Sequence, residues 1–269
     1  MNPDYLPAAN ILRNPATYVV VLTGAGISAE SGIPTFRGPE GYWTQGSKVY
    51  APQEIATRKM FTREPETVWQ WYLHRLHACH GAAPNAGHMA VAAMEKQLGD
   101  RFTLITQNID NLHLVAGNTA ERTCQIHGNI NFTRCIRPCS DTLLPLPEVD
   151  PDTDPEMLHW HLTCPGCGDW LRPHVLWFDE FYDEEWYRSE TALRRAQEAD
   201  ILIVAGTSGA TNLPNRIVLT AVEKRIPIID INIEPSPFSE PARRSPGGGF
   251  LRQSCSGALA ALSGIVKGD

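Results

Sequence analysis

The sequence predicts an α/β fold, namely a Rossmann-like doubly wound parallel sheet with a smaller zinc-binding and helical module. Short apolar runs that suit buried strands alternate with helical patterns along the chain. Glycine or polar residues follow each run, and four cysteines form two close pairs. With 269 residues, of which 42% are hydrophobic, the chain can form one large domain with a small appendage.

Four runs have the short, apolar and β-branched character of buried parallel strands. They lie at residues 18–23, 102–106, 201–205 and 226–231. The helical patterns lie at residues 66–79, 87–98, 184–198 and 214–224. Since strands and helices alternate, we expect βαβ units and a parallel sheet. A last short strand and a helix are expected after the glycine- and proline-rich loop at 245–249.

Two insertions set the predicted domain organisation. The Rossmann-like domain is expected to be discontinuous, over residues 10–37, 85–130 and 172–265. Residues 38–84 are expected to form a cofactor loop and a helical excursion, and residues 131–171 the zinc-binding module with an acidic, proline-rich stretch.

Composition argues against several classes of protein. The formal net charge is −7 and no run is rich in lysine or arginine, so direct binding to nucleic acid is not expected. The first 13 residues lack the basic start and apolar core of a signal peptide, and no apolar run approaches the roughly 18 residues of a membrane span. Seven cysteines, an odd number, argue against a secreted disulfide framework. We expect a cytoplasmic, monomeric protein that does not contact membranes.

Polar residues follow each of the four predicted strands, where open parallel sheets bind their ligands. The four segments are Gly24-Ala25-Gly26-Ile27-Ser28-Ala29, Gln107-Asn108-Ile109-Asp110, Gly206-Thr207-Ser208 and Asn232-Ile233-Glu234. We expect them to meet in one polar crevice.

The first of these segments matches a dinucleotide fingerprint, Gly24-x-Gly26-x-x-Ala29, in which small residues let backbone amides at a helix N-terminus approach a pyrophosphate. Taken alone, the motif also fits a tight turn without a ligand. An ordinary dehydrogenase has a second strand that ends in Asp or Glu about 20 residues later. Here the next predicted strand begins only near Phe102, so the sequence favours a nucleotide site other than an ordinary hydride-transfer site.

The cysteine pairs Cys135-x3-Cys139 and Cys164-x2-Cys167 have the spacing of two knuckles around one tetrahedral zinc. Four thiolates leave no open coordination position, so the metal is expected to be structural. The alternative is a set of unpaired buried cysteines.

A histidine that titrates near about 6.5 can act as a general base at neutral pH. His127 follows a segment expected to cross the mouth of the crevice. The sequence pattern alone does not separate it from His88, His113 and His174.

The segment from Gly24 to Arg37 closely resembles the cofactor loop of the sirtuin family. Further matches follow in the same order and extend nearly to the last helix. They are residues 107–113, 126–128, the four cysteines, and residues 172–175, 206–208 and 232–234. The resemblance implies an NAD-dependent protein-lysine deacylase. In that family the acyl-lysine carbonyl oxygen attacks the anomeric carbon of the nicotinamide ribose and expels nicotinamide. The overall reaction releases nicotinamide and O-acyl-ADP-ribose.

The resemblance also implies roles for individual residues. His127 is the expected general base for a ribose hydroxyl, with Asn108 and Asp110 beside it as catalytic residues. The residues implied around NAD are Gly24, Ala25, Gly26, Ser28, Ala29, Glu30, Phe36, Arg37, Trp43, Gln107, Asn108, Ile109, Asp110, Gly206, Thr207, Ser208, Asn232, Ile233, Glu234 and Cys255. Those implied along the acyl-lysine peptide are Val175, Leu176, Trp177 and Phe178. NAD is the expected co-substrate and one zinc ion the expected structural metal.

A second match concerns the acyl group. Tyr72 and Arg75 lie at i and i+3, so a helix places a phenol and a guanidinium side by side, where they can bind a carboxylate. Ala56 leaves space for a longer acyl chain. The arrangement is similar to the sirtuin subclass that removes succinyl, malonyl and glutaryl groups. The alternative is that the pair decorates a solvated helix face.

Three other functions remain open at this point: a plain lysine deacetylase, a mono-ADP-ribosyltransferase with the same NAD site, and a non-catalytic reader of NAD or acyl-lysine. The sequence also departs from the family pattern. The first cysteine pair is spaced x3 where x2 is usual, Asp179 stands where glycine is usual, and Ala210-Thr211-Asn212 is more polar than expected.

Overall fold

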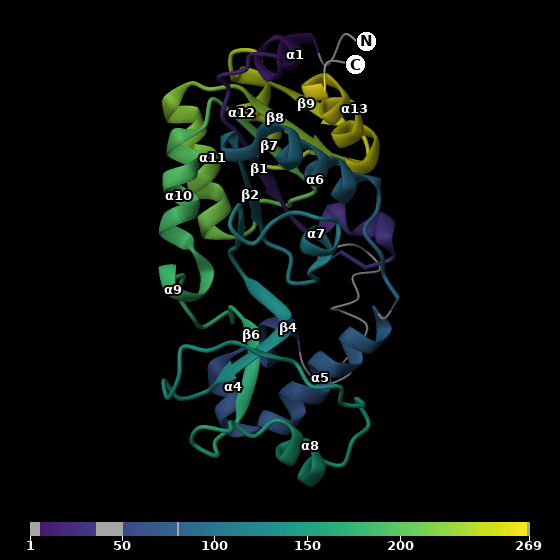
Figure 1. Cartoon of the computed structure of the whole chain (residues 1–269), viewed down its shortest axis with the longest axis vertical. Helices are drawn as coiled ribbons and strands as arrows, with labels where there is room; N and C mark the ends of the chain where they lie inside the picture. Colours follow the sequence, from purple (N-terminus) through teal and green to yellow (C-terminus); the bar gives the residue numbers. More distant parts are fainter. Residues whose placement is uncertain (1–5, 36–50, 80, 268–269) are drawn as a thin grey trace.

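The computed structural model describes residues 6–35, 51–79 and 81–267. Figure 1 shows a larger unit, which holds the first and last described helices, α1 (Leu6–Leu12) and α13 (Cys255–Lys267), above a smaller unit. The smaller unit is built around β4 (Gly128–Cys135), β6 (Leu171–Val175), α4 (Arg58–Arg63), α5 (Pro65–Ala78) and α8 (Pro155–His161). Within these ranges, none of the helices combines the length and the apolar character needed to span a bilayer.

The larger unit is built on a parallel sheet. Its strands, among the described residues, are β1 (Val19–Thr23), β2 (Phe102–Thr106), β3 (Thr123–Gln125), β7 (Ile201–Ala205), β8 (Ile228–Asn232) and β9 (Gly249–Arg252). Their order in the sheet is β3-β2-β1-β7-β8-β9, and every neighbouring pair is parallel. This is the strand order of a Rossmann fold, so the predicted fold class is confirmed.

Helices cover both faces of the sheet because alternate strand residues point to opposite sides. Val19 and Val21 of β1 belong to one apolar cluster, together with side chains of α1 (Leu6–Leu12), α6 (Ala86–Leu98) and α13 (Cys255–Lys267). Val20 and Leu22 belong to a second cluster. That cluster includes side chains of α10 (Ser189–Glu198), α11 (Asn212–Lys224) and α12 (Ser239–Arg244).

Three details of the larger unit differ from the prediction. The segment before His127 does not cross the mouth of the crevice, because it forms the edge strand β3 and pairs with β2. The helix predicted at 184–198 is divided into α9 (Glu184–Tyr187) and α10 at Arg188, whose φ is +50°. The fourth predicted strand begins two residues later, at Ile228.

The smaller unit has an antiparallel sheet in the order β5-β4-β6, formed by β5 (Leu144–Pro145), β4 (Gly128–Cys135) and β6 (Leu171–Val175). It extends past both predicted limits of the zinc-binding module, 131 and 171. One apolar cluster joins this sheet to the helices packed against it. Those helices are α3 (Pro52–Ile55), α4 (Arg58–Arg63), α5 (Pro65–Ala78) and α8 (Pro155–His161).

Short helices complete the connections. They are α7 (Leu112–Val115) and the 3-10 turns at Ala25–Ile27, Ala29–Ser31 and Gly99–Arg101. The first two 3-10 turns follow β1 directly, and they determine the shape of the loop at the carboxyl end of that strand.

Candidate active site

The crevice lies at the switch point of the sheet, where the chain runs outward from β1 in one direction and from β7 in the other. Two strand-end loops meet there backbone to backbone. Gly26 N donates to Gly206 O at 2.8 Å, and a Cβ atom on Gly26 would lie only 2.7 Å from Gly206 Cα. Gly206 also has a φ of +64°, which favours glycine. Glycine at both positions therefore allows the two loops to approach each other.

The loop after β1 corrects one expectation. A helix N-terminus was expected to face the pyrophosphate, but Gly24 is followed by two single-turn 3-10 helices in place of an α-helix. Such short helices supply backbone amides without the summed dipole of a longer α-helix. Within this loop, Ile27 and Ser28 are buried, whereas Ala29 and Glu30 are exposed.

Three polar side chains from the ends of β1 and β2 are linked in the crevice. Ser28 Oγ donates to Asp110 Oδ2 at 2.6 Å, and Asn108 Nδ2 donates to Ser28 Oγ at 3.0 Å. Asn108 N in turn donates to Thr106 Oγ1 at 3.1 Å. These bonds hold Asn108 and Asp110 in fixed orientations next to the glycine loops.

Thr207 connects the ends of β2, β7 and β8. Its Oγ1 accepts from Gln107 Nε2 at 2.8 Å, and its backbone oxygen accepts from Asn232 Nδ2 at 2.8 Å. Thr207 is buried, while Ser208 is exposed. The polar ends of the four predicted strands are therefore brought together, as expected from the sequence.

The other predicted nucleotide contacts lie around this centre. Glu30 Oε1 accepts from Ser256 N at 3.2 Å beside the buried Cys255, which begins α13. Glu234 forms a two-point ion pair with Arg252, with both N–O distances 2.8 Å, and it is exposed, as is Ile233. Phe36, Arg37 and Trp43 lie outside the described residues.

His127 follows β3 and lies next to Gln107. Its Nδ1 is 2.9 Å from Gln107 O. A carbonyl oxygen can only accept a hydrogen bond, so Nδ1 carries the hydrogen and Nε2 keeps the lone pair. Burial lowers the pKa of His127 to about 4. The imidazole is therefore neutral at physiological pH, which is the form that can accept a proton.

The other three histidines are more deeply buried than His127, although His88 also borders the crevice, with Nε2 3.4 Å from Ser28 Oγ. His88 and His113 are buried and meet edge to face with their ring centroids 4.8 Å apart, and His113 Nε2 is 3.0 Å from Thr23 Oγ1. His174 is buried in the smaller unit and stacks on Tyr187 at 5.8 Å. These contacts favour packing roles and distinguish His127 from the others.

The residues predicted to bind the acyl-lysine peptide gather where the smaller unit meets the crevice. Ala56, Tyr72, Val175 and Trp177 belong to one apolar cluster. The backbone adds two links, since Leu176 N donates to His127 O at 2.9 Å and Phe178 N donates to Ala56 O at 3.1 Å.

Tyr72 and Arg75 are not on a solvated helix face, so that alternative is wrong. Tyr72 is 2% exposed and Arg75 is 6% exposed. Tyr72 accepts a hydrogen bond from Trp177 Nε1 at 3.1 Å, and Arg75 Nη1 donates to Trp71 O at 2.9 Å. Both side chains therefore face the interior of the smaller unit.

Four thiols converge at the other end of this unit. Their sulfur atoms all lie within 4.8 Å of one another, with Cys135 and Cys167 at 3.4 Å and Cys139 and Cys164 at 3.5 Å. Tetrahedral zinc with bonds of about 2.3 Å requires sulfur separations of about 3.8 Å, so the cluster fits one zinc ion. The x3 spacing therefore does not prevent convergence, and the alternative of four unpaired buried cysteines is wrong.

The cysteine cluster is remote from His127. Strand β4 begins at Gly128, next to His127, and ends at the ligand Cys135. Seven residue steps along a strand cover about 23 Å. Zinc held there can stabilise the smaller unit but cannot contact the crevice.

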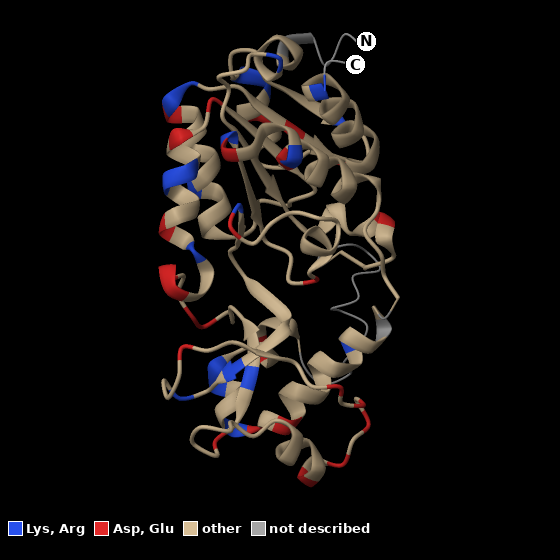
Figure 2. Cartoon of the chain, viewed as in Figure 1, with Lys and Arg blue, Asp and Glu red and all other residues tan. Residues whose placement is uncertain are grey.

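The crevice and the smaller unit also differ in their charged residues. Figure 2 shows a run of acidic residues on the loop between β5 and α8, far from the crevice, while the segments that border the crevice carry few charges. The acidic stretch identified in the sequence is therefore a surface of the smaller unit.

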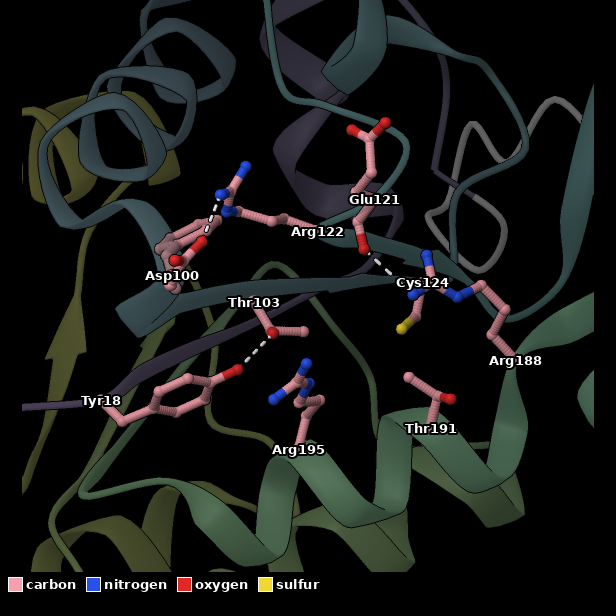
Figure 3. A pocket seen from close by; sticks show the side chains of 10 residues that line it. Tyr18, Asp100, Thr103, Glu121, Arg122, Cys124, Arg188, Thr191 and Arg195 are labelled. Carbon is pink, nitrogen blue, oxygen red and sulfur yellow. Dashed lines mark hydrogen bonds and ion pairs between the residues drawn. The ribbon is translucent and has the colours of Figure 1, made fainter.

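A separate hollow of about 270 Å³ lies at the opposite ends of the strands (Figure 3). Tyr18, which lines it, comes directly before β1, and Phe102 begins β2. Its three arginines already have partners, since Arg122 pairs with Asp100, Arg195 pairs with Glu198 and Arg188 donates to backbone oxygens. Because ligands of open α/β sheets bind at the carboxyl ends of the strands, the crevice is the better candidate site.

The fold and the crevice define a Rossmann-like protein with a dinucleotide-type glycine loop, a half-buried neutral imidazole and a four-cysteine metal centre. A profile of the Sir2 family matches residues 24–212. This match covers more than half of the chain. The chain belongs to the Sir2 family, and its resemblance to sirtuins is confirmed.

Individual relatives agree with this assignment. An NAD-dependent protein deacylase from Leptospira interrogans is 38% identical over 221 residues, which cover 82% of this chain and 83% of the relative. NAD-dependent protein deacylase 2 from Pyrobaculum aerophilum is 41% identical over 221 residues, 81% of each chain. Among solved structures, an ADP-ribose complex of a Sir2 homologue has a TM-score of 0.79 at 32% identity, with 96% of both chains covered. A Sir2 homologue in complex with NAD has a TM-score of 0.77 at 32% identity, covering 97% of this chain and 93% of the other.

Buried histidines give the fold a specific pH dependence. Burial lowers the pKa of His113 to about 3 and those of His127 and His174 to about 4. In the unfolded chain these groups titrate near about 6.5. Between these values the unfolded state binds more protons, so the unfolding free energy falls as the pH is lowered from about 7 towards 4. Urea denaturation at about pH 7 and about pH 5 measures this loss.

A matched variant isolates the contribution of one imidazole. His174→Gln removes one buried titrating group, so its stability should fall less steeply between the two pH values than that of the unmodified chain. The metal ligands and carboxylates are the same in both proteins, so their contributions to the pH dependence of stability cancel when the two proteins are compared. Equal slopes would show that His174 is not held neutral by the fold.

Proposed function

We propose that this chain is an NAD-dependent protein-lysine deacylase that favours acyl groups carrying a carboxylate, such as succinyl, malonyl and glutaryl. The relatives named NAD-dependent protein deacylases support the reaction class. The acyl preference rests on one observation, the buried guanidinium of Arg75 on the same helix as Tyr72.

The two side chains offer complementary donors. The Arg75 guanidinium lies 3.5 Å from the centroid of the Trp71 ring, which orients its plane. The Tyr72 oxygen accepts from Trp177 Nε1, so its own hydrogen can point to another acceptor. Burial raises the pKa of Tyr72, so the phenol keeps that hydrogen at neutral pH. A guanidinium beside a phenol suits a carboxylate.

The size of the neighbouring side chain agrees with a longer acyl group. Ala56 belongs to the same apolar cluster as Tyr72, and its backbone oxygen accepts from Phe178 N. A methyl side chain at this position occupies little volume beside the segment proposed to bind the peptide. We therefore assign Ala56, Tyr72 and Arg75 to the acyl group.

The crevice supplies the remaining roles in this proposal. His127 accepts a proton from a ribose hydroxyl at Nε2, while Asn108 and Asp110 orient the ribose and nicotinamide region. The glycine loops and the polar strand ends bind the phosphates, the second ribose and the adenine. Residues 175–178 pair with the substrate peptide. NAD is the co-substrate that carries the leaving group, and the four-cysteine centre stabilises the fold around it.

Exchange of Arg75 tests the acyl preference. In Arg75→Met the positive charge is lost while a long apolar stem remains, so a succinyl or glutaryl carboxylate loses its charge-assisted hydrogen bonds. Such bonds are worth about 1.5–3 kcal/mol, which corresponds to a loss of about 10- to 100-fold in kcat/KM. Activity on acetyl-lysine, which has no carboxylate, should change by no more than about threefold. Rates with acetyl, succinyl, malonyl and glutaryl peptides measure the difference.

Two variants serve as controls. Tyr72→Phe keeps the ring and removes one donor, so it should reduce desuccinylation less than Arg75→Met does. Arg63→Met removes an exposed guanidinium at the end of α4, which pairs with Glu64. This variant should leave both activities unchanged. Equal losses on acetyl and succinyl peptides in Arg75→Met would contradict the proposed preference.

Mass spectrometry separates the reaction classes. Loss of the acyl group together with nicotinamide release supports deacylation, whereas a target protein that gains ADP-ribose would indicate a mono-ADP-ribosyltransferase. A chain that binds acyl peptide and NAD without releasing nicotinamide would be a reader.

A further inference from the structure

The proton-accepting nitrogen of His127 faces the hydroxyl of Tyr182. The Nε2–Oη distance is 2.9 Å, and the two ring centroids lie 5.9 Å apart with 30° between the planes. Because Gln107 O fixes the hydrogen on Nδ1, Nε2 can only accept, and Tyr182 is the donor. Burial raises the pKa of Tyr182 to about 12, so the phenol keeps its hydrogen at neutral pH.

Tyr182 is held in place by the larger unit. It lies between β6 and α9, directly before Asp183, whose side chain accepts from Trp186 N at 2.7 Å and caps α9. The ring packs against the apolar cluster that includes Leu213 of α11. The phenol is therefore a half-buried group in a defined position.

Two groups of Gln107 lie near the His127 imidazole, namely its backbone oxygen and its side-chain amide. Its backbone oxygen bonds to His127 Nδ1. Its side-chain Oε1 accepts from Thr211 Oγ1 at 3.1 Å, and Thr211 also lies near the hydroxyl of Tyr182. The segment around Thr211, which is more polar than the family pattern, thus belongs to the surroundings of His127.

We propose that Tyr182 is a positioning residue that orients the imidazole of His127 for its role as the base. One hydrogen bond at Nδ1 leaves the ring free to rock, since the χ2 torsion of histidine has a broad minimum. A second bond at the opposite nitrogen removes this freedom and holds the ring in one orientation as the ribose hydroxyl approaches Nε2. The inference rests on the proposed function, because it requires His127 to act as the base.

Tyr182→Phe tests the inference, since the ring and its packing remain while the hydroxyl is lost. We expect kcat to fall about tenfold, the rate equivalent of one neutral hydrogen bond, with both KM values unchanged within about twofold. If Tyr182 only stabilised the fold, its loss would not lower kcat while leaving both KM values unchanged. In ¹⁵N NMR spectra, the Nε2 resonance of His127 is identified by its loss in His127→Asn. In Tyr182→Phe this resonance should shift towards the value of an imidazole nitrogen that accepts no hydrogen bond.

Tyr18→Phe is the matched control. It removes a phenol that bonds to Thr103 Oγ1 at 2.7 Å at the opposite ends of the strands (Figure 3), so kcat and the His127 resonances should not change. If Tyr182→Phe does not fold, Thr211→Val removes the neighbouring hydroxyl and should lower kcat by a smaller factor, with the same division between kcat and KM.

Three outcomes would overturn the inference. They are an unchanged Nε2 resonance in Tyr182→Phe, a shifted resonance with unchanged kcat, and a rise in kcat/KM for NAD, which would make Tyr182 a competitor of the nucleotide. Absence of turnover in the unmodified chain contradicts the proposed function instead. In that case the NMR comparison still reports whether the hydrogen bond exists.

Discussion

His127→Asn should lower kcat for deacylation by about 100- to 10,000-fold, the usual contribution of a positioned general base. An asparagine amide can still donate to Gln107 O, as Nδ1 of the imidazole does, but it has no basic nitrogen. The proton of the ribose hydroxyl then has no acceptor in the protein. Nicotinamide release with an acyl peptide measures the loss, and calorimetry with NAD should give a Kd within about threefold of the unmodified value.

His174→Gln is the matched control for this experiment. It also removes a neutral imidazole, but one that is buried and stacks on Tyr187. Turnover should stay within about threefold of normal. If His127→Asn kept more than about a tenth of the original kcat, another group would have to be the base.

Loss of one cysteine ligand should abolish zinc binding and unfold the smaller unit. Structural zinc contributes an apparent 10–16 kcal/mol in small zinc modules, as much as the total stability of many domains. Cys164→Ser changes a buried ligand of the cluster. We expect less than about 0.1 zinc per chain by elemental analysis, a loss of about 10 °C or more in Tm, and no deacylation.

Cys124→Ala controls for the loss of a thiol outside the cluster. Cys124 is buried in β3 and is not one of the four ligands, so this variant should retain one zinc per chain. A Cys164→Ser protein with full zinc content and an unchanged Tm would contradict a structural metal at this site.

The central strands could be predicted because all five residues of β1, β2 and β7 are buried and therefore read as continuous apolar runs. β3 has only three residues, too few for a periodic pattern, and its place at the sheet edge depends on pairing with β2. The interruption at Arg188 is also a tertiary effect. Its guanidinium donates to backbone oxygens of Ala120, Glu121 and Thr123, which hold the residue where the helix breaks.

The strand-end motifs predicted where the crevice would form, because parallel strands bring their carboxyl ends to one edge. The contacts inside it could not be predicted. Ser28 meets Asp110 across 82 positions, and Tyr182 meets His127 across 55. No local pattern specifies either contact, and Tyr182 lies outside the strand-end motifs and the cysteine pairs.

The smaller unit is attached to the base itself. β4 starts one residue after His127, Gly128 pairs with Val175, and Leu176 N is bonded to His127 O. Since Nδ1 of the same imidazole is bonded to Gln107 O in the larger unit, His127 is tied to both units. A rotation of the smaller unit that carried the imidazole away from the glycine loops would break this bond. The spacing between the base, the peptide-binding segment and the nucleotide loops is therefore fixed by one residue.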